Sequence, residues 1–245
     1  MCQTNVLIIG NGNVAWHFER MFGTDAAFNV SKVDSRLPKI DCDGADVAII
    51  AVKDDAIAAV ADKVVAKGAM VVHTSGFCGI DVLTHCSRTY GGLYPLLSLK
   101  KGNEVAYDSM PLCVEANSDS GRQRLVLIAQ RLTSAVYCID SEQRKRLHIA
   151  ATFANNFTNH LLGVVQSQMA AANLPFEMLF ALIDKTIADI KTSDAASLQT
   201  GAAFRNDRTT IDAHRALLSD DQLRLYDVFT GQIRSLTKQS CNQTN

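Results

Sequence analysis

The first apolar run of the chain, Asn5–Ile9, leads directly into a glycine-containing turn, and this junction constrains the fold more than any other feature. The turn reads Gly-Asn-Gly-Asn-Val-Ala over residues 10–15 and fits the pattern G-x-G-x-x-[G/A]. A segment with helical periodicity, Val14–Phe22, follows it. A short apolar strand, a tight turn and a helix in this order predict the first β-α unit of a parallel sheet.

Each small residue of this turn has a physical role in binding a dinucleotide. Gly10 permits the tight turn, Gly12 lets the backbone approach a pyrophosphate, and Ala15 lets the helix pack close to the strand. The helix N-terminus adds unpaired N–H groups and a partial positive charge. The alternative is a glycine-rich turn without a ligand. We predict that cofactor is bound here by Gly10, Asn11, Gly12, Asn13 and Val14.

Alternating strand-like and helix-like segments continue through the first half of the chain. Strands are predicted at residues 28–33, 46–52, 69–73, 110–114 and 135–139, and helices at 54–65 and 120–132. Short, continuously apolar strands separated by helices indicate a parallel sheet that is buried on both faces. The prediction is a Rossmann-like, doubly wound α/β domain over residues 1–140.

Strand signals end after Asp140, and the remainder is predicted to be an all-α domain over residues 141–245. Ser141 suits a helix N-cap, and helical pattern then runs to about Ala172. At 1.5 Å per residue, such a helix of about thirty residues spans about 45 Å. Further helices are predicted at residues 175–191, 208–218 and 220–238.

The end of the second predicted strand bears on the choice of cofactor. An acidic residue there binds the ribose hydroxyls of NAD, whereas a hydroxyl and an arginine hold the 2′-phosphate of NADP. The chain has Asp34, Ser35 and Arg36 in succession, so spacing alone leaves both open. The fork geometry of arginine favours phosphate, and we predict NADP, held by Ser35 and Arg36, with NAD as the alternative.

Two further strand ends fall on the carboxyl edge of the sheet, where ligands bind in such folds. His73 stands at one of them and is predicted to be a hydrogen-bonded structural histidine rather than a catalytic one. Lys53 stands at the other, either in solvent or reaching a phosphate. The predicted cofactor residues at these ends are Ala51, Val52, Lys53, Thr74, Ser75 and Gly76, the last three near the nicotinamide.

Several strings together resemble a bacterial NADP-oxidoreductase-like family, which has a Rossmann domain and a helical C-terminal domain of undetermined function. That family is related to pyrroline-carboxylate reductases and to phosphogluconate-dehydrogenase-like enzymes. The strings are GNGNVA from Gly10, AVKDDAI from Ala51, HTSG from His73, YPLLS from Tyr94, HIAATFANNF from His148 and TGAAFRNDRTTI from Thr200.

The resemblance implies a nicotinamide cleft between the domains and a homodimer built through the helical domain. The chain departs from the family pattern at two places. Tyr94 replaces the usual histidine of His-Pro-Leu-Gln-Thr; it can donate a hydrogen bond but does not titrate near neutrality. Asn206 replaces the glycine of Arg-Gly-Asp, and asparagine tolerates left-handed backbone.

Polar residues in the predicted long helix are the catalytic candidates. His148 and Asn155 are seven residues apart and therefore share one helix face, with Asn156 and Asn159 close to it. His148 can supply the proton that accompanies hydride transfer, and an asparagine can orient a carbonyl or carboxylate. The alternative is a polar seam satisfied across an interface. With Tyr94, the predicted catalytic set is Tyr94, His148, Asn155 and Asn159.

A loop between helices supplies the predicted substrate contacts, Arg205 and Asp207. Arg205 can clamp a carboxylate or phosphate through two hydrogen bonds, or it can pair with Asp207 and hold the loop shut.

Charge and hydropathy argue against two classes of protein, those that bind nucleic acid and those that span a membrane. A net charge of -1 gives no basic field for nucleic acid, and no apolar run approaches the length of a membrane helix. The seven cysteines form no C-x-x-C pair and are predicted to be reduced thiols, and no metal site is predicted. A signal peptide is not evident, so we expect a cytoplasmic protein.

The predicted function is an NADP-dependent oxidoreductase that transfers a hydride between nicotinamide and a small carbonyl, imine or hydroxy compound. The alternatives are a non-catalytic sensor that binds NADP and a dimeric scaffold protein. The tyrosine at position 94 favours the sensor over the enzyme.

Overall fold

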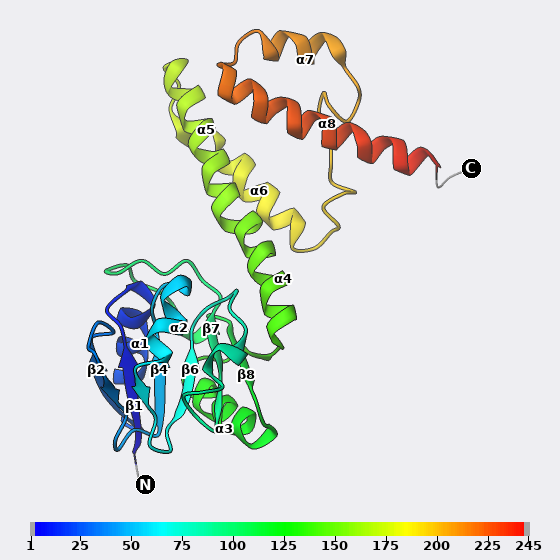
Figure 1. Cartoon of the computed structure of the whole chain (residues 1–245). Helices are drawn as coiled ribbons and strands as arrows, with labels where there is room; N and C mark the ends of the chain where they lie inside the picture. The colour runs from blue at the N-terminus through cyan, green and yellow to red at the C-terminus, as the bar shows by residue number, and fades with distance from the viewer. Residues whose placement is uncertain (1–2, 243–245) are drawn as a thin grey trace. The chain divides into compact units, whose positions relative to one another are not determined.

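The computed structural model describes residues 3–242, with side chains described to residue 236, and divides into two compact units, Met1–Thr158 and Asn159–Asn245 (Figure 1). The boundary predicted near Asp140 coincides with the start of a helix, whereas the compact first unit extends to Thr158. No helix in the described part of the chain is long and apolar enough to cross a membrane.

A seven-stranded sheet forms the centre of the first unit, with strand order β2-β1-β4-β6-β7-β8-β9. Its strands are β1 (Thr4–Ile9), β2 (Phe28–Val33), β4 (Val47–Ile50), β6 (Met70–His73), β7 (Tyr90–Pro95), β8 (Leu112–Ala116) and β9 (Val136–Cys138). Neighbouring strands are parallel except β7 and β8, which pair antiparallel with Leu93 opposite Val114. The mostly parallel, Rossmann-like sheet confirms the predicted fold class.

The prediction of a helix over residues 54–65 is wrong at the C-terminal end, because the helix ends at Ala61. A short 3₁₀ helix η1 (Asp54–Ala56) leads into α2 (Ile57–Ala61), and the helix stops there. The two β-branched residues of β5 (Val64–Val65) instead pair with β3 (Ile40–Asp41) in a separate two-stranded sheet. The Lys63 carbonyl accepts from the Ile40 amide at 2.9 Å, so tertiary pairing overrides the helical pattern here.

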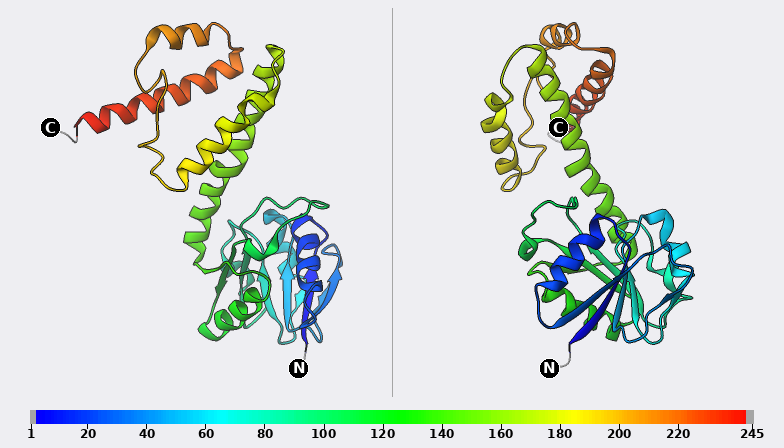
Figure 2. Two further views of the ribbon diagram at one scale, coloured as in Figure 1. Left: turned by 180° about the vertical axis from the view of Figure 1, so that it is seen from behind. Right: turned by 90° about the vertical axis from the view of Figure 1, so that its left-hand side faces the viewer.

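Helices cover both faces of the sheet, as the right-hand view of Figure 2 shows. On one face, α1 (Asn13–Gly23) and α3 (Asp119–Gln130) bury Phe18, Phe22 and Leu125 against alternate strand residues. On the other face, α2 and the 3₁₀ helix η2 (Ile80–Leu83) bury Val60 and Leu83. Strand residues therefore alternate between two cores, as expected for a doubly wound sheet.

A helix leaves the sheet after β9 and carries several site residues. Asp140, rather than Ser141, caps α4 (Ser141–Ala151) in a capping box with Gln143. A π-helical turn, η4 (Thr152–Phe157), follows, and α5 (Thr158–Ala171) continues from it. The predicted end near Ala172 is confirmed, but the π turn had no sequence signal.

The second unit contains four further helical segments. These are η5 (Phe176–Leu179), α6 (Phe180–Ile190), α7 (Arg208–Arg215) and α8 (Asp220–Asn242). Burial is sparse: among residues 159–236, only Ile211 and Thr230 are buried. This unit therefore lacks the closed core of the first.

Candidate active site

The glycine turn after β1 has the geometry that the motif requires. Gly10 has a φ of 129°, and a Cβ there would lie 2.4 Å from the Ala51 carbonyl oxygen, so a side chain is excluded. Gly12 is the N-cap of α1, and a Cβ at Gly12 would have no neighbour within 4 Å. No side chain caps α1, so the first-turn N–H groups are open to an anion.

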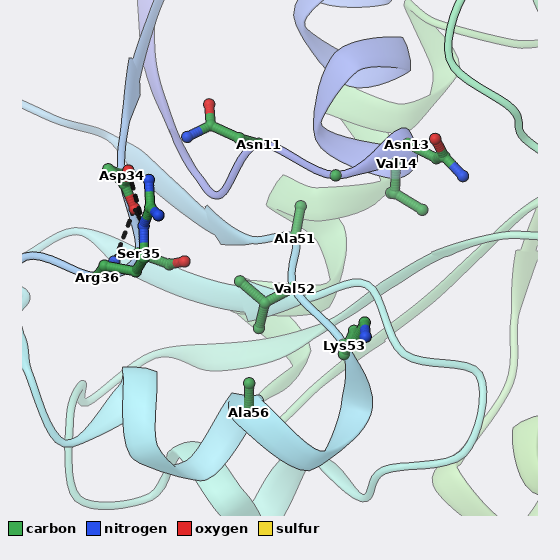
Figure 3. A pocket seen from close by; sticks show the side chains of 11 residues that line it. Asn11, Asn13, Val14, Asp34, Ser35, Arg36, Ala51, Val52, Lys53 and Ala56 are labelled. Carbon is green, nitrogen blue, oxygen red and sulfur yellow. Dashed lines mark hydrogen bonds and ion pairs between the residues drawn. The ribbon is translucent and has the colours of Figure 1, made fainter.

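A cavity of about 580 Å³ lies beside this turn (Figure 3). We call it the glycine-turn cavity. Figure 3 shows Asn11 and Val14 of the turn at the top, residues 51–53 below them, and Asp34 and Arg36 at the opposite end from Val14. Its lining residues are Asn11, Gly12, Asn13, Val14, Asp34, Ser35, Arg36, Ala51, Val52, Lys53 and Ala56.

Asp34 and Arg36 form an ion pair at the end of β2, within this cavity. Arg36 Nε donates to Asp34 Oδ1 at 3.0 Å and Nη2 to Oδ2 at 2.6 Å. Side-chain and backbone hydrogen bonds from Arg36 lower the pKa of Asp34 to about 2. The Arg36 side chain is 87% exposed, so its guanidinium is accessible to a ligand phosphate while it pairs with Asp34.

A second cavity, of about 670 Å³, shares Asn13 and Val14 with the first. We call it the Tyr94–His148 cavity, because the Tyr94 hydroxyl lies 3.2 Å from His148 Nδ1 there. Thr74, Asn155 and Asn156 also line it. The remaining walls are largely aliphatic: Pro95, Leu96, Leu97, Leu99, Leu147, Ala150, Ala151 and Ala154.

Three elements of the first unit bring this polar group together. Tyr94 comes from β7, His148 from the last turn of α4, and Asn155 from the π turn. Burial raises the pKa of Tyr94, so this hydroxyl stays protonated and able to donate at neutral pH. The π turn is a feature that often accompanies functional sites in helices.

The turn after β6 touches the Tyr94–His148 pair directly. A Cβ on Gly76 would lie 2.6 Å from His148 Nδ1 and 2.8 Å from Tyr94 Cζ. Ser75 Oγ accepts from the amides of Phe77 and Cys78 at 3.0 and 2.9 Å, which folds the turn on itself. Gly76 therefore allows an approach between backbone and side chains that no other residue permits.

His73 has a partner on each ring nitrogen, as a structural histidine requires. The Ser75 amide donates to Nδ1 at 3.2 Å, so Nε2 carries the proton toward the Gly79 carbonyl at 3.3 Å. The side chain is fully buried, and burial, with the charge of Arg144, lowers its pKa to about 4. A neutral, fully bonded imidazole is thus built into the base of the turn.

Sequence reasoning missed Arg144, which is 1% exposed. Its Nε donates to the Ser75 carbonyl at 3.1 Å and Nη2 to the Cys78 carbonyl at 2.6 Å, while Nη1 pairs with Glu115. Ser141 Oγ donates to Glu115 Oε2 at 2.8 Å. A charged residue in a polar helical segment usually faces solvent, so nothing in the sequence marks this one as buried.

The first helix also anchors the chain between β7 and β8. Asn13 Oδ1 accepts from the Lys101 amide at 3.1 Å. The buried His17 lies 2.7 Å from the Tyr107 hydroxyl through Nδ1 and 3.0 Å from the Lys100 carbonyl through Nε2. Leu97 and Leu99, in the same connection, line the Tyr94–His148 cavity, so these bonds hold one of its walls.

The remaining candidates belong to the second unit, and their roles stay predictions. These are Asn159, Arg205 and Asp207. Asp207 caps α7 by accepting from the Thr210 amide at 3.1 Å and from its hydroxyl at 2.7 Å. Hydrogen bonds from Thr210 lower the pKa of Asp207, and the charge of Arg205 lowers it further, so both alternatives for Arg205 stay predictions.

Five cysteines are free thiols: Cys42, Cys78, Cys86, Cys113 and Cys138. Cys2 and the Cys241 side chain lie outside the described part of the chain.

Comparison with known proteins places the chain among reductase-like structures. A Bacteroides fragilis protein provisionally described as an NADP oxidoreductase is 30% identical, with 95% of this chain and 98% of that chain covered and a TM-score of 0.81. A comparison with proteins of curated function found no match.

Two more distant structures share the fold. A Plasmodium falciparum pyrroline carboxylate reductase with NADP bound is 9% identical, with 96% of this chain and 100% of that chain covered and a TM-score of 0.58. An imine reductase variant from Myxococcus stipitatus, in complex with NAD⁺, is 14% identical, with 97% and 94% covered and a TM-score of 0.58.

The family model of a domain of unknown function, DUF2520, matches residues 110–233, which is half of the chain. The Bacteroides protein, which is 30% identical over nearly the whole of both chains, extends the similarity beyond the residues that this domain covers. The chain belongs to the DUF2520 family.

Proposed function

We propose that this protein is an NADP-dependent oxidoreductase. The observation that carries the proposal is the continuity of its two cavities, which share Asn13 and Val14 at the N-terminus of α1. An extended dinucleotide fits this path with its adenosine half near Asp34 and Arg36 and its nicotinamide half near Tyr94 and His148. The oxidoreductase-like neighbours support the same reading.

The residues of the first unit fit the parts of such a cofactor. The open N–H groups of α1 suit the pyrophosphate, and Ser35 and Arg36 suit a 2′-phosphate. Thr74 lines the second cavity, which suits the nicotinamide half, and Gly76 packs against the Tyr94–His148 pair that faces this cavity. When bound, NADPH supplies the hydride.

The protein's own contribution to the chemistry is positioning and proton supply. Tyr94 and His148, hydrogen-bonded at 3.2 Å, can hold the proton that a carbonyl or imine acquires as it is reduced. Asn155 lines the same cavity and can orient the substrate. The substrate is a small carbonyl, imine or hydroxy compound, and Asn159, Arg205 and Asp207 remain proposed contacts from the helical unit.

The protein is also proposed to act as a homodimer built through its helical unit. That unit exposes large apolar side chains that a partner copy would cover, among them Met178 at 62%, Leu182 at 63% and Leu217 at 80% exposure. Surfaces of this kind mark protein interfaces.

Cofactor binding is tested through Trp16, the only tryptophan, which lies in the second turn of α1 beneath the Arg20 guanidinium. Titration with NADPH should change its fluorescence, and calorimetry should give a tighter dissociation constant for NADPH than for NADH. Absence of heat and fluorescence change with both nucleotides would overturn the proposal.

The charges at the end of β2 allow a sharper test of cofactor choice. Arg36→Gln should weaken NADPH about tenfold while leaving NADH within about twofold, since one charge-assisted contact to phosphate is worth about 1.5–3 kcal/mol before solvent exposure reduces it. Asp34→Asn should favour NADPH further by removing a negative charge beside the phosphate. A matched surface change, Arg122→Gln in α3, should alter neither.

A second candidate function, a sensor that binds NADP without turnover, is favoured by Tyr94, which stands where the pattern of the family that the chain resembles implies a histidine. The two functions differ in one measurement. NADPH bound to the protein would be followed at 340 nm while a panel of small aldehydes, ketones and imines is added. Oxidation by any member supports the reductase; its absence across the panel, with binding intact, supports the sensor.

A further inference from the structure

Arg144 lies on or contacts both elements that carry the Tyr94–His148 pair, α4 and β7, and it also bonds the turn after β6. Its side chain lies on α4, one turn before His148. It donates to two carbonyls of the turn after β6, Ser75 at 3.1 Å and Cys78 at 2.6 Å. It also packs against β7, because a Cβ on Gly92 would lie 3.2 Å from Arg144 Nη1, and Gly92 is two residues before Tyr94.

The turn that Arg144 contacts is also held together by its own hydrogen bonds. Ser75 Oγ accepts two amides of the turn, and His73 bonds the Ser75 amide on one side and the Gly79 carbonyl on the other. A restraint on the Ser75 and Cys78 carbonyls therefore fixes the whole of residues 74–78. Within that turn, Gly76 is already as close to His148 and Tyr94 as backbone can come.

The guanidinium is itself fixed from the opposite side. Glu115 pairs with Nη1, and Ser141 Oγ lies 3.2 Å from Nη2 while donating to Glu115 at 2.8 Å. A buried, planar fork with four separate acceptors holds one geometry, which a lysine ammonium on a flexible stem cannot reproduce.

We propose that Arg144 is the positioning residue of the nicotinamide half of the site: it fixes the turn 74–78 against α4, and through the contact at Gly76 it sets the positions of Tyr94 and His148, which line the Tyr94–His148 cavity. This inference rests on the proposed function, because it assigns the nicotinamide to that cavity. Within the turn, Thr74 lines that cavity, whereas none of residues 74–78 lines the glycine-turn cavity, so the effect falls on one half of the cofactor only.

The test separates the two halves of the cofactor by comparing NADPH with adenosine 2′,5′-bisphosphate, which lacks the nicotinamide half. Arg144→Lys keeps the charge and loses the fork. Its affinity for NADPH should fall about tenfold, whereas its affinity for the bisphosphate should change less than twofold. In NMR spectra, the His148 ring resonances should shift in this variant while those of His214, in the second unit, stay in place.

Arg131→Lys is the matched control, because Arg131 forms a comparable fork to Asp25 on the surface, at 2.6 and 2.8 Å, and does not line either cavity. It should leave both affinities unchanged. If Arg144→Lys does not fold, Ser141→Ala removes only the hydroxyl that braces Arg144 and Glu115 and should give the same selective loss, by about threefold.

Failure of the positioning role and failure of the proposed function give different results. Equal losses of NADPH and bisphosphate affinity, or no loss of either, in the folded Arg144 or Ser141 variant would overturn the positioning role. Absence of binding of both probes to the unaltered protein would overturn the proposed function instead.

Discussion

The two compact units differ in how much of their apolar side-chain surface is buried. The first buries aromatic and aliphatic side chains on both faces of its sheet, and even its buried histidines and its buried arginine have hydrogen-bond partners. The second buries only Ile211 and Thr230 among residues 159–236 and exposes large apolar residues along α6 and α8. The first unit has closed apolar cores, whereas the second exposes apolar surface of the kind that occurs at protein interfaces.

This difference in burial suits the two units to different functions. Preorganised sites need side chains whose positions are fixed by packing and bonding, and the first unit provides them around both cavities. The sparsely buried helices suit the proposed dimer, in which their apolar residues would be buried by a second copy.

Removal of core volume should distinguish the units most strongly. Phe18 of α1 is fully buried, so Phe18→Ala should lower the free energy of unfolding by about 3–5 kcal/mol at any protein concentration. Phe180 of α6 is 47% exposed, and Phe180→Ala should cost less than about 1 kcal/mol in dilute protein. Urea denaturation followed by Trp16 fluorescence measures the first, and circular dichroism the second. Equal losses would remove the contrast.

Acid should weaken the first unit through His73. Its pKa is about 4 in the folded protein and 6.5 as an ordinary value, so the unfolded chain takes up this proton first as the pH falls. The stabilisation is complete above pH 6.5 and is lost by pH 4, by about 3 kcal/mol at 1.36 kcal/mol per pKa unit.

His73→Gln should flatten the dependence of unfolding free energy on pH in that window. Carboxylates such as Asp34, whose pKa falls from 3.8 to about 2, lose their stabilisation mainly below about pH 5 and leave the upper part of the window clear. Urea midpoints at pH 7, 5.5 and 4.5, read from Trp16, make the measurement. A slope that persists in the variant would assign the acid sensitivity to another group.

A charge on the helical unit should weaken self-association. Leu182 of α6 is 63% exposed, and Leu182→Lys should raise the dimer dissociation constant at least tenfold, which corresponds to about 1.4 kcal/mol. Leu127→Lys in α3 is matched in exposure at 66% and should leave it unchanged. Sedimentation equilibrium gives both constants. A chain that stays monomeric at high concentration would contradict the proposed dimer.

Local patterns were sufficient to predict most of the sheet. The apolar runs of β1, β2, β4 and β6 appear at nearly the predicted positions, because continuous apolar sequence between turns has few other uses. The strand β7 was missed because Tyr90-Gly-Gly-Leu-Tyr-Pro contains two glycines and a proline. Those glycines are required by close packing: a Cβ on Gly91 would lie 2.0 Å from the Glu115 carbonyl oxygen.

The candidate site was only partly accessible from sequence. Local chemistry indicated the glycine turn and the residues at the ends of β2, β4 and β6. His148 and Asn155 were placed together by helical spacing, and both line one cavity although a π turn intervenes. Arg144, Glu115 and His17 could not be found, since their burial arises from contacts between residues far apart in the chain.

The ion pair at the end of β2 has a consequence for how this chain can evolve. Asp34 and Arg36 bond to each other, and neither belongs to the buried set that forms the two cores. Substitutions there should change the free energy of unfolding by no more than about 0.5 kcal/mol, as is usual for surface positions. Under the proposed function, coenzyme preference is therefore separable from folding: a lineage could change from NADP to NAD by mutating three consecutive codons, without first acquiring compensating stability elsewhere.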